Sequence, residues 1–146
     1  MDEPVLLTGA GGRVGRAILA GIGETYDWRL LDREPVAADA LPDGVGDDDV
    51  VVADVTDEAG VREAVESVGA IVHLAGDPRP NAPWDSVLSN NIDGTQTMFE
   101  AAVDAGVDRF VFASSNHAVG AYETDERTPD MYRTDDRFRL DGTELP

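Results

Sequence analysis

The sequence predicts an α/β fold in which a parallel sheet lies between two layers of helices. Five short apolar runs alternate with helical or loop stretches, which is the order typical of parallel sheets. The runs are nearly continuous in Val, Leu, Ile and Phe, as expected for strands that are covered on both faces. We therefore expect strands at residues 4–8, 28–32, 50–54, 70–75 and 109–114.

A glycine-rich turn follows the first run, in residues 8–15 (TGAGGRVG). Gly9 permits a tight turn, Gly12 lets the backbone approach a pyrophosphate, and Gly15 allows the following helix to pack closely on the strand. The helix N-terminus adds free N–H groups and a positive dipole end. The pattern predicts a three-layer, Rossmann-type dinucleotide-binding sheet with strand order 3-2-1-4-5.

The second strand supports this prediction because it ends in an acid. Asp32 lies 23 residues after Gly9, where a carboxylate can accept hydrogen bonds from the adenosine ribose hydroxyls. Its negative charge would repel the 2′-phosphate of NADP, so we expect NAD as the cofactor. NADP is the less favoured alternative, because Arg13 or Arg33 could bind that phosphate bidentately.

Helices are expected over residues 12–22, 57–67 and 84–106, and the Asp-rich residues 39–49 are expected to form a loop. The first helix shows apolar residues at helical spacing at Val14, Ala17 and Ile18. The longest helix carries Val87, Leu88, Ile92, Thr95, Phe99, Ala102 and Val103 on one face. Gly106 is placed to end that helix.

The composition is strongly acidic, with 30 Asp and Glu residues against 11 basic ones, all arginine, and a net charge of −19. Such a charge repels nucleic-acid phosphates and anionic membranes, so neither is an expected partner. The acids are spread along the chain, which indicates a solvated surface adapted to high salt, in the cytoplasm of a salt-adapted microbe. The absence of cysteine excludes disulfides and thiol catalysis, and we expect no metal site and no signal peptide or membrane span.

With its glycine-rich turn, Asp32, Asp54-Val55, Leu74-Ala75-Gly76, Asn91 and Ser114-Ser115, the chain resembles the extended short-chain dehydrogenase/reductase superfamily, in its NAD-dependent epimerase/dehydratase group. The resemblance runs from residue 4 to about residue 122 and implies an oxidoreductase. It implies that Asp54 and Val55 lie beside the adenine, with a turn or helix-capping acid as the alternative for Asp54. The full set of cofactor residues is then Gly9, Gly12, Arg13, Val14, Gly15, Asp32, Asp54, Val55, Leu74, Ala75 and Gly76.

At the end of the fifth strand, Ser114-Ser115-Asn116-His117 resembles the uronate dehydrogenases of this group, as does Pro83-Trp84 before the long helix. These enzymes oxidise C1 of a hexuronate to an aldarolactone with NAD. The resemblance implies that Ser115 bonds the reacting hydroxyl, that Asn116 and His117 contact the sugar acid, and that Asn91 supports the proton relay. His117 can instead be a satisfied turn residue. We interpret His73 as a core histidine, and Trp84 and Phe99 as packing residues.

The chain departs from the superfamily at its proton acceptor, a Tyr-x-x-x-Lys pair. There is no lysine, and residues 30, 126 and 136, four positions after the three tyrosines, are Leu, Glu and Asp. Compared with the family, the sheet is therefore expected to be truncated after the fifth strand. We interpret residues 1–122 as an incomplete cofactor-binding domain and residues 123–146 as a polar loop or tail leading toward the missing catalytic helix. The chain alone is expected to be inactive, and its uncovered fifth strand favours a homo-oligomer. The alternatives are a nucleotide-sugar epimerase or dehydratase, or a non-catalytic NAD-binding module.

Overall fold

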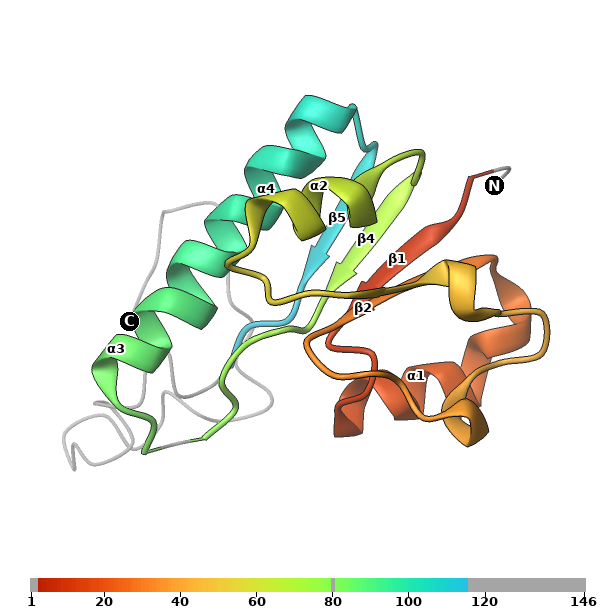
Figure 1. The fold of residues 1–146 in the computed structure, drawn as a ribbon, viewed down its shortest axis with the longest axis horizontal. Coiled ribbons are helices and arrows are strands. Elements are labelled where there is room, and N and C mark those ends of the chain that lie inside the picture. The colour runs from red at the N-terminus through yellow and green to blue at the C-terminus, as the bar shows by residue number, and fades with distance from the viewer. Residues whose placement is uncertain (1–2, 80, 116–146) are drawn as a thin grey trace, which may run out of the picture. The chain divides into compact units, whose positions relative to one another are not determined.

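The computed structural model describes residues 3–79 and 81–115 and shows one five-stranded sheet in which every pairing is parallel (Figure 1). The strands are β1 (Val5–Thr8), β2 (Trp28–Asp32), β3 (Val50–Val52), β4 (Ala70–His73) and β5 (Arg109–Phe112). Their order is β3-β2-β1-β4-β5, and β1 pairs with both β2 and β4. The predicted α/β class and strand order are therefore confirmed.

Helices connect the strands. They are α1 (Arg13–Ile22), α2 (Glu58–Val65), α3 (Trp84–Ser86), a π-helical segment η4 (Val87–Asp93) and α4 (Gly94–Ala105). The predicted helix over 84–106 is present but contains that π-helical stretch, and Gly106 ends it at a φ of 74°. The predicted loop at 39–49 contains most of one short 3-10 turn, η2 (Ala38–Ala40), and the whole of another, η3 (Asp47–Asp49). A third such turn, η1 (Gly23–Thr25), precedes β2.

β3 and β4 end earlier than predicted because side chains form hydrogen bonds in the segments that follow them. The Asp54 carboxylate accepts hydrogen bonds from the Thr56 amide at 2.9 Å and hydroxyl at 2.8 Å, so the chain turns away after β3. The amides of Leu74 and Ala75 both donate to the Thr8 hydroxyl, which ends β4 at His73. Asp57 accepts from the Ala59 amide and caps α2, which therefore begins at Glu58.

The two faces of the sheet hold separate parts of the core, because successive strand side chains point to opposite faces. Leu6, Leu31 and Ile71 pack against α2 and α4, whereas Leu7 and Leu30 pack against α1. Figure 1 shows α1 on one side of the sheet and α2 with α4 on the other. The three predicted layers are present.

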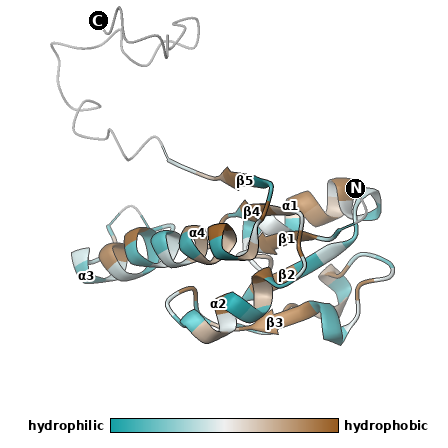
Figure 2. Cartoon of the chain, turned by 90° about the horizontal axis from the view of Figure 1, so that it is seen from above, coloured by the Kyte–Doolittle hydropathy of each residue, from teal (hydrophilic) through white to brown (hydrophobic). Residues whose placement is uncertain are grey.

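The helices do not all present the faces that their spacing indicated. In α1, Leu19 is buried and Ile18 packs at the core, but Val14 is 57 % exposed. In α4 the buried side chains are Met98, Ala101 and Ala102, whereas Ile92, Phe99 and Val103 of the long helix are exposed. Figure 2 shows hydrophobic and hydrophilic residues alternating along this helix. Trp84, predicted to pack, is 64 % exposed.

Of the described residues, those up to Ala113 belong to one compact unit, and Ser114 and Ser115 belong to a second. The predicted boundary between residues 122 and 123, and the polar segment 123–146, lie outside the described residues. Within the described part of the chain, no helix combines the length and the apolar character that a membrane crossing requires.

Candidate functional site

A cleft of about 660 Å³ lies at the carboxyl ends of β1 to β4. This is the edge at which open parallel sheets bind their ligands. The lining residues come from the glycine-rich turn and α1 (Gly11, Gly12, Arg16), from residues 31–35, 53–55 and 75–79, and from the start of the long helix (Ser86, Asn90). The cleft therefore spans both halves of the sheet, on either side of β1.

The glycine-rich turn forms one wall, and its shape depends on missing side chains. Gly9 has a φ of 68°, and its amide donates to the Leu31 carbonyl at 2.8 Å. A Cβ on Gly15 would lie 2.5 Å from the Gly9 carbonyl oxygen and 2.6 Å from that of Ala10. Helix α1 can therefore approach the turn this closely only with glycine at position 15, and the backbone of the turn borders the cleft directly.

Asp32 stands at the end of β2 and is tied to the glycine-rich turn. Its Oδ2 accepts from the Gly11 amide at 2.9 Å, and its Oδ1 accepts from the Glu34 amide at 3.3 Å. A carboxylate has about four lone-pair sites, so two backbone donors leave acceptor capacity for further hydroxyl groups. The geometry thus fixes an acidic acceptor beside the turn, as a ribose diol requires.

The ends of β3 and β4 supply the remaining strand-edge residues. Asp54 lines the cleft, but its Oδ1 is engaged by Thr56, so this acid also shapes its own turn. Val55 is buried, and a Cβ on Gly94 would lie only 2.6 Å from its Cγ2 atom. Ala75 lines the cleft, and its amide donates to the Thr8 hydroxyl at 3.1 Å. Ala75 and Gly76 therefore leave little side-chain bulk directly after β4.

Asn91, the predicted relay residue, lies in the π-helical segment and holds the loop after β4. Its Oδ1 accepts from the Asp77 amide at 2.7 Å, and its Nδ2 donates to the Asp77 carbonyl at 3.1 Å. Both polar atoms of the side chain are thus engaged with one backbone residue. π-helical turns inside α-helices are frequent at functional sites.

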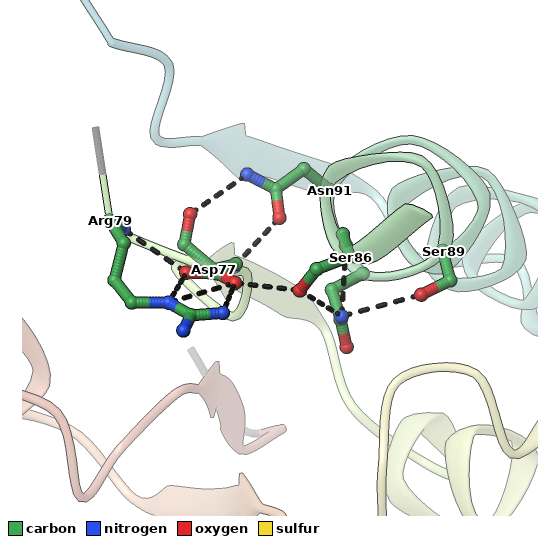
Figure 3. A network of polar contacts seen from close by, with 6 residues as sticks. Asp77, Arg79, Ser86, Ser89 and Asn91 are labelled. Carbon is green, nitrogen blue, oxygen red and sulfur yellow. Dashed lines mark hydrogen bonds and ion pairs between the residues drawn. The ribbon is translucent and has the colours of Figure 1, made fainter. Parts of the chain in front are cut away.

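A charged cluster that the sequence analysis did not identify lies at this end of the cleft (Figure 3). The Asp77 carboxylate accepts from Arg79 Nε and Nη2 and from the Ser86 hydroxyl, and its side chain is only 8 % exposed. The hydrogen bonds from Arg79 and then Ser86 hold the pKa of the Asp77 carboxyl well below its usual range. Arg79 itself is 61 % exposed and lines the cleft.

The structure places the predicted cofactor residues in three groups. Those lining the cleft are Gly12, Asp32, Asp54, Val55, Ala75 and Gly76. Gly9 and Gly15 shape the turn, and Leu74 packs at the core below the sheet edge. Arg13 and Val14 are exposed on α1 and are absent from the lining. These positions do not test the roles, which stay predictions.

The described structure does not test the predicted substrate residues. Ser115 lies three residues after the end of β5 and belongs to the second unit. Asn116 and His117 lie outside the described residues. Gly11, Arg16, Asp77, Arg79, Ser86 and Asn90 were missed as lining residues. One available signal was position, since Asp77 and Arg79 directly follow a predicted strand at its carboxyl end.

The cleft is suited to a dinucleotide. The glycine-rich turn borders the cleft with backbone alone, and a Cβ on Gly12 would lie only 3.1 Å from the Gly9 carbonyl oxygen. Asp32 offers a fixed acceptor at one end, and Ala75 and Gly76 leave the other end free of bulky side chains at these two positions. Gly11, Gly12 and Asp32 would hold the diphosphate and adenosine ribose, and the β4 end would border the nicotinamide.

Known proteins resemble this chain along most of its length. It is 72 % identical over 146 residues to the NAD-dependent glucose-6-phosphate dehydrogenase of Haloferax volcanii, of which it covers 56 %. It is 40 % identical over 126 residues to the uronate dehydrogenase of Pseudomonas putida, covering 84 % of this chain and 44 % of that one. The chain therefore spans about half the length of these relatives.

A solved structure is also similar to this chain. A variant of uronate dehydrogenase from Agrobacterium tumefaciens, complexed with NAD, matches with a TM-score of 0.67 at 34 % identity, over 79 % of this chain and 42 % of that one. The model of the NAD dependent epimerase/dehydratase family matches residues 5–137. The described cleft, its acidic residue after β2 and these matches agree, and the chain belongs to the NAD-dependent epimerase/dehydratase family.

Proposed function

We propose that this chain forms the cofactor-binding part of an NAD-dependent dehydrogenase that oxidises C1 of a cyclic hexose bearing an anionic group at C6. The observation that carries the proposal is the cleft with two chemically different ends. Asp32 at one end suits the adenosine ribose, and the cluster of Asp77, Arg79 and Ser86 lies at the other. NAD, when bound, accepts the hydride from C1.

Two relatives favour substrates that share this chemistry. Glucose 6-phosphate carries a phosphate at C6 and a hexuronate carries a carboxylate there. We favour glucose 6-phosphate because the enzyme named for it is 72 % identical to this chain, and we keep the hexuronate as the second candidate. Arg79 is the cleft-lining cation near the β4 end and suits either anion.

The residues have separate tasks in this proposal. Asn91 fixes the loop after β4 through the Asp77 backbone, and Asp77 orients the Arg79 guanidinium, three of whose five N–H donors are not engaged by Asp77. Ser115 hydrogen-bonds the reacting hydroxyl, and Asn116 and His117 contact the sugar. The chain contains no lysine, so it lacks the Tyr-x-x-x-Lys acceptor, and we expect no turnover from these 146 residues alone.

Ligand binding in molar salt tests the proposal. Fluorescence titration should show NADH binding more tightly than NADPH, and Asp32→Asn should weaken NADH binding. Ligand-observed NMR on the NAD-loaded chain should then detect glucose 6-phosphate or glucuronate. UDP-glucose binding alone would favour the nucleotide-sugar epimerase or dehydratase alternative. NADH binding with no sugar bound at all would favour the non-catalytic module, and tighter NADPH binding would overturn the choice of NAD.

We further propose that the protein works in the cytoplasm of a salt-adapted organism. The charge of −19 on 146 residues, with arginine as the sole basic residue type, supports this proposal, as does the Haloferax relative. Self-repulsion between the acids weakens when salt screens it. Urea unfolding should therefore give a larger free energy of unfolding at molar salt than at low salt, and the opposite order would contradict the proposal.

Assembly into a homo-oligomer stays a prediction. Exposed apolar side chains are present on β5 and the neighbouring helix, namely Ile92, Phe99, Val103, Val111 and Phe112. Exposed apolar surface and an edge strand both favour association with another chain. Light scattering in molar salt measures the mass, and a sharp monomeric value would contradict the prediction.

A further inference from the structure

His73 is the last residue of β4 and is fully buried, although its imidazole is polar. Its Nδ1 lies 2.8 Å from the Thr8 hydroxyl oxygen, and its Nε2 lies 3.2 Å from the Thr95 hydroxyl oxygen. The rings of Phe110 and Phe112 lie 5.9 Å and 6.0 Å away, between centroids. The histidine thus joins a residue of β1 to a residue of α4 through the interior.

The hydrogen bonds on the β1 side fix the direction of the contact at Nδ1. The Thr8 hydroxyl oxygen accepts from the amides of Leu74 and Ala75, each at 3.1 Å, and the Leu74 amide is shared with the Thr8 carbonyl at 3.3 Å. Both lone pairs of this oxygen are therefore used. Its single proton must point to His73, so Nδ1 is the acceptor and carries no hydrogen.

The bonds on the α4 side lead independently to the same conclusion. The Thr95 hydroxyl lies 2.7 Å from the Asn91 carbonyl oxygen, and because a carbonyl only accepts, Thr95 is the donor. Its proton is then committed, so the hydroxyl oxygen accepts from His73 at Nε2. The imidazole is therefore neutral with its hydrogen on Nε2, in agreement with burial, which lowers the pKa of His73 to about 4.

The resulting series of bonds connects two parts of the cleft. It starts at the amide of Ala75, which lines the cleft, and passes through Thr8, His73 and Thr95 to the carbonyl of Asn91. The side chain of Asn91 in turn holds the backbone of Asp77 with bonds of 2.7 Å and 3.1 Å. Every member has a defined donor and acceptor, so the series has one direction.

We propose that His73 is a positioning residue: in its Nε2–H tautomer it sets the place of Asn91, and through Asn91 that of the loop at residues 77–79, relative to the cofactor wall at Ala75. It touches neither cofactor nor substrate. The role follows from the hydrogen-bond directions and does not depend on which sugar the protein binds. A histidine that only fills space would have no preferred tautomer and no effect on the Asp77 loop.

Nitrogen-15 NMR of the folded 146-residue chain tests the tautomer directly. The sequence has two histidines, so the His73→Gln spectrum assigns the His73 signals by their loss. We expect an imidazole with a protonated Nε2 and an unprotonated Nδ1 near neutral pH. A ring with the proton on Nδ1, or one that averages between both tautomers, would overturn the proposal.

A matched pair of variants tests the coupling. Thr95→Val keeps the shape but removes the hydroxyl, whereas Thr95→Ser keeps the hydroxyl. Hydrogen exchange at the Asp77 amide, which reports the Asn91 contact, should accelerate about tenfold in Thr95→Val, the equivalent of one lost hydrogen bond, and stay near wild type in Thr95→Ser.

The amides of β1 provide the reference for global stability. The proposal requires the Asp77 amide to lose more protection than the β1 amides in Thr95→Val. Equal losses at both places would show a purely structural role and refute it, as would an unchanged Asp77 amide. His73→Phe, which removes both contacts, should give the same local loss and weaker NADH binding, and unchanged NADH affinity would count against the proposal.

Discussion

Replacing Gly15 by alanine should distort the glycine-rich turn that borders the cleft. Gly21→Ala in the same helix is the matched control. A Cβ on Gly15 would lie 2.5 Å and 2.6 Å from two carbonyl oxygens and 2.8 Å from the Ala10 Cα, all backbone atoms. Backbone cannot rotate away as a flexible side chain can, so either α1 or the glycine-rich turn must shift. A Cβ on Gly21 meets nothing within 4 Å.

The two substitutions share the same gain in helix propensity, roughly 0.5–1 kcal/mol for glycine to alanine inside a helix. At position 21 this gain stands alone, so the free energy of unfolding should rise slightly or stay unchanged. At position 15 overpacking costs about 1–3 kcal/mol, so after the gain in propensity the net loss lies between about 0 and 2.5 kcal/mol, centred near 1 kcal/mol. A displaced turn also changes the shape of the cleft beside Asp32, and we expect NADH to bind about tenfold more weakly.

Urea unfolding and NADH fluorescence titration, both in molar salt, measure these effects. If Gly15→Ala proves as stable as Gly21→Ala and binds NADH as tightly as the wild type, the reasoning from the close contacts is refuted. A loss of NADH affinity in Gly21→Ala would equally remove the control and the argument.

Three further predictions concern single side chains. Burial lowers the pKa of His73 from 6.5 to about 4, so the unfolded chain takes up the proton first; the stability from neutral His73 is complete above pH 6.5 and is lost as the pH falls toward 4. Between pH 7 and pH 5, the free energy of unfolding in urea should therefore fall by about 2 kcal/mol more in the wild type than in His73→Gln. Equal decreases in the two proteins would contradict this prediction. Asp57→Ala removes the cap of α2 and should cost about 1 kcal/mol in the same assay, whereas Asp57→Asn should cost much less. Arg79→Gln should weaken binding of glucose 6-phosphate or glucuronate to the NAD-loaded chain by NMR titration while leaving NADH affinity unchanged; an unchanged sugar affinity would remove Arg79 from the proposed site.

The sequence was sufficient for the sheet because those signals are local. Apolar runs with strand-length spacing, a glycine-rich turn between strand and helix, and an acid at the end of β2 each lie within a few residues, and the strand order is the one that a Rossmann-type sheet implies. Gly12, Asp32 and Ala75 do line one cleft, and their cofactor roles stay predictions.

What the sequence could not supply depends on contacts between distant segments. Helical spacing alone cannot say which side of a helix meets the sheet, so Val14 and Val103 were counted with apolar faces that the described structure leaves exposed. The hydrogen bonds between Asn91 and the Asp77 backbone join residues that are 14 positions apart in the sequence, and the bond between Thr8 and His73 joins residues that are 65 positions apart. No local pattern encodes such pairs.

The π-helical stretch at Val87–Asp93 changes the direction in which the following side chains of the long helix point. Each added residue turns a helix by roughly 100°, so one extra residue per turn lets the first part of the helix aim Ser86 and Asn90 at the cleft while the second part aims Met98 at the sheet. Shortening the stretch by one residue would cancel that offset and rotate one of the two surfaces out of register. This helix should therefore tolerate exchanges at exposed positions such as Gln96 and Val103 but not a change of length.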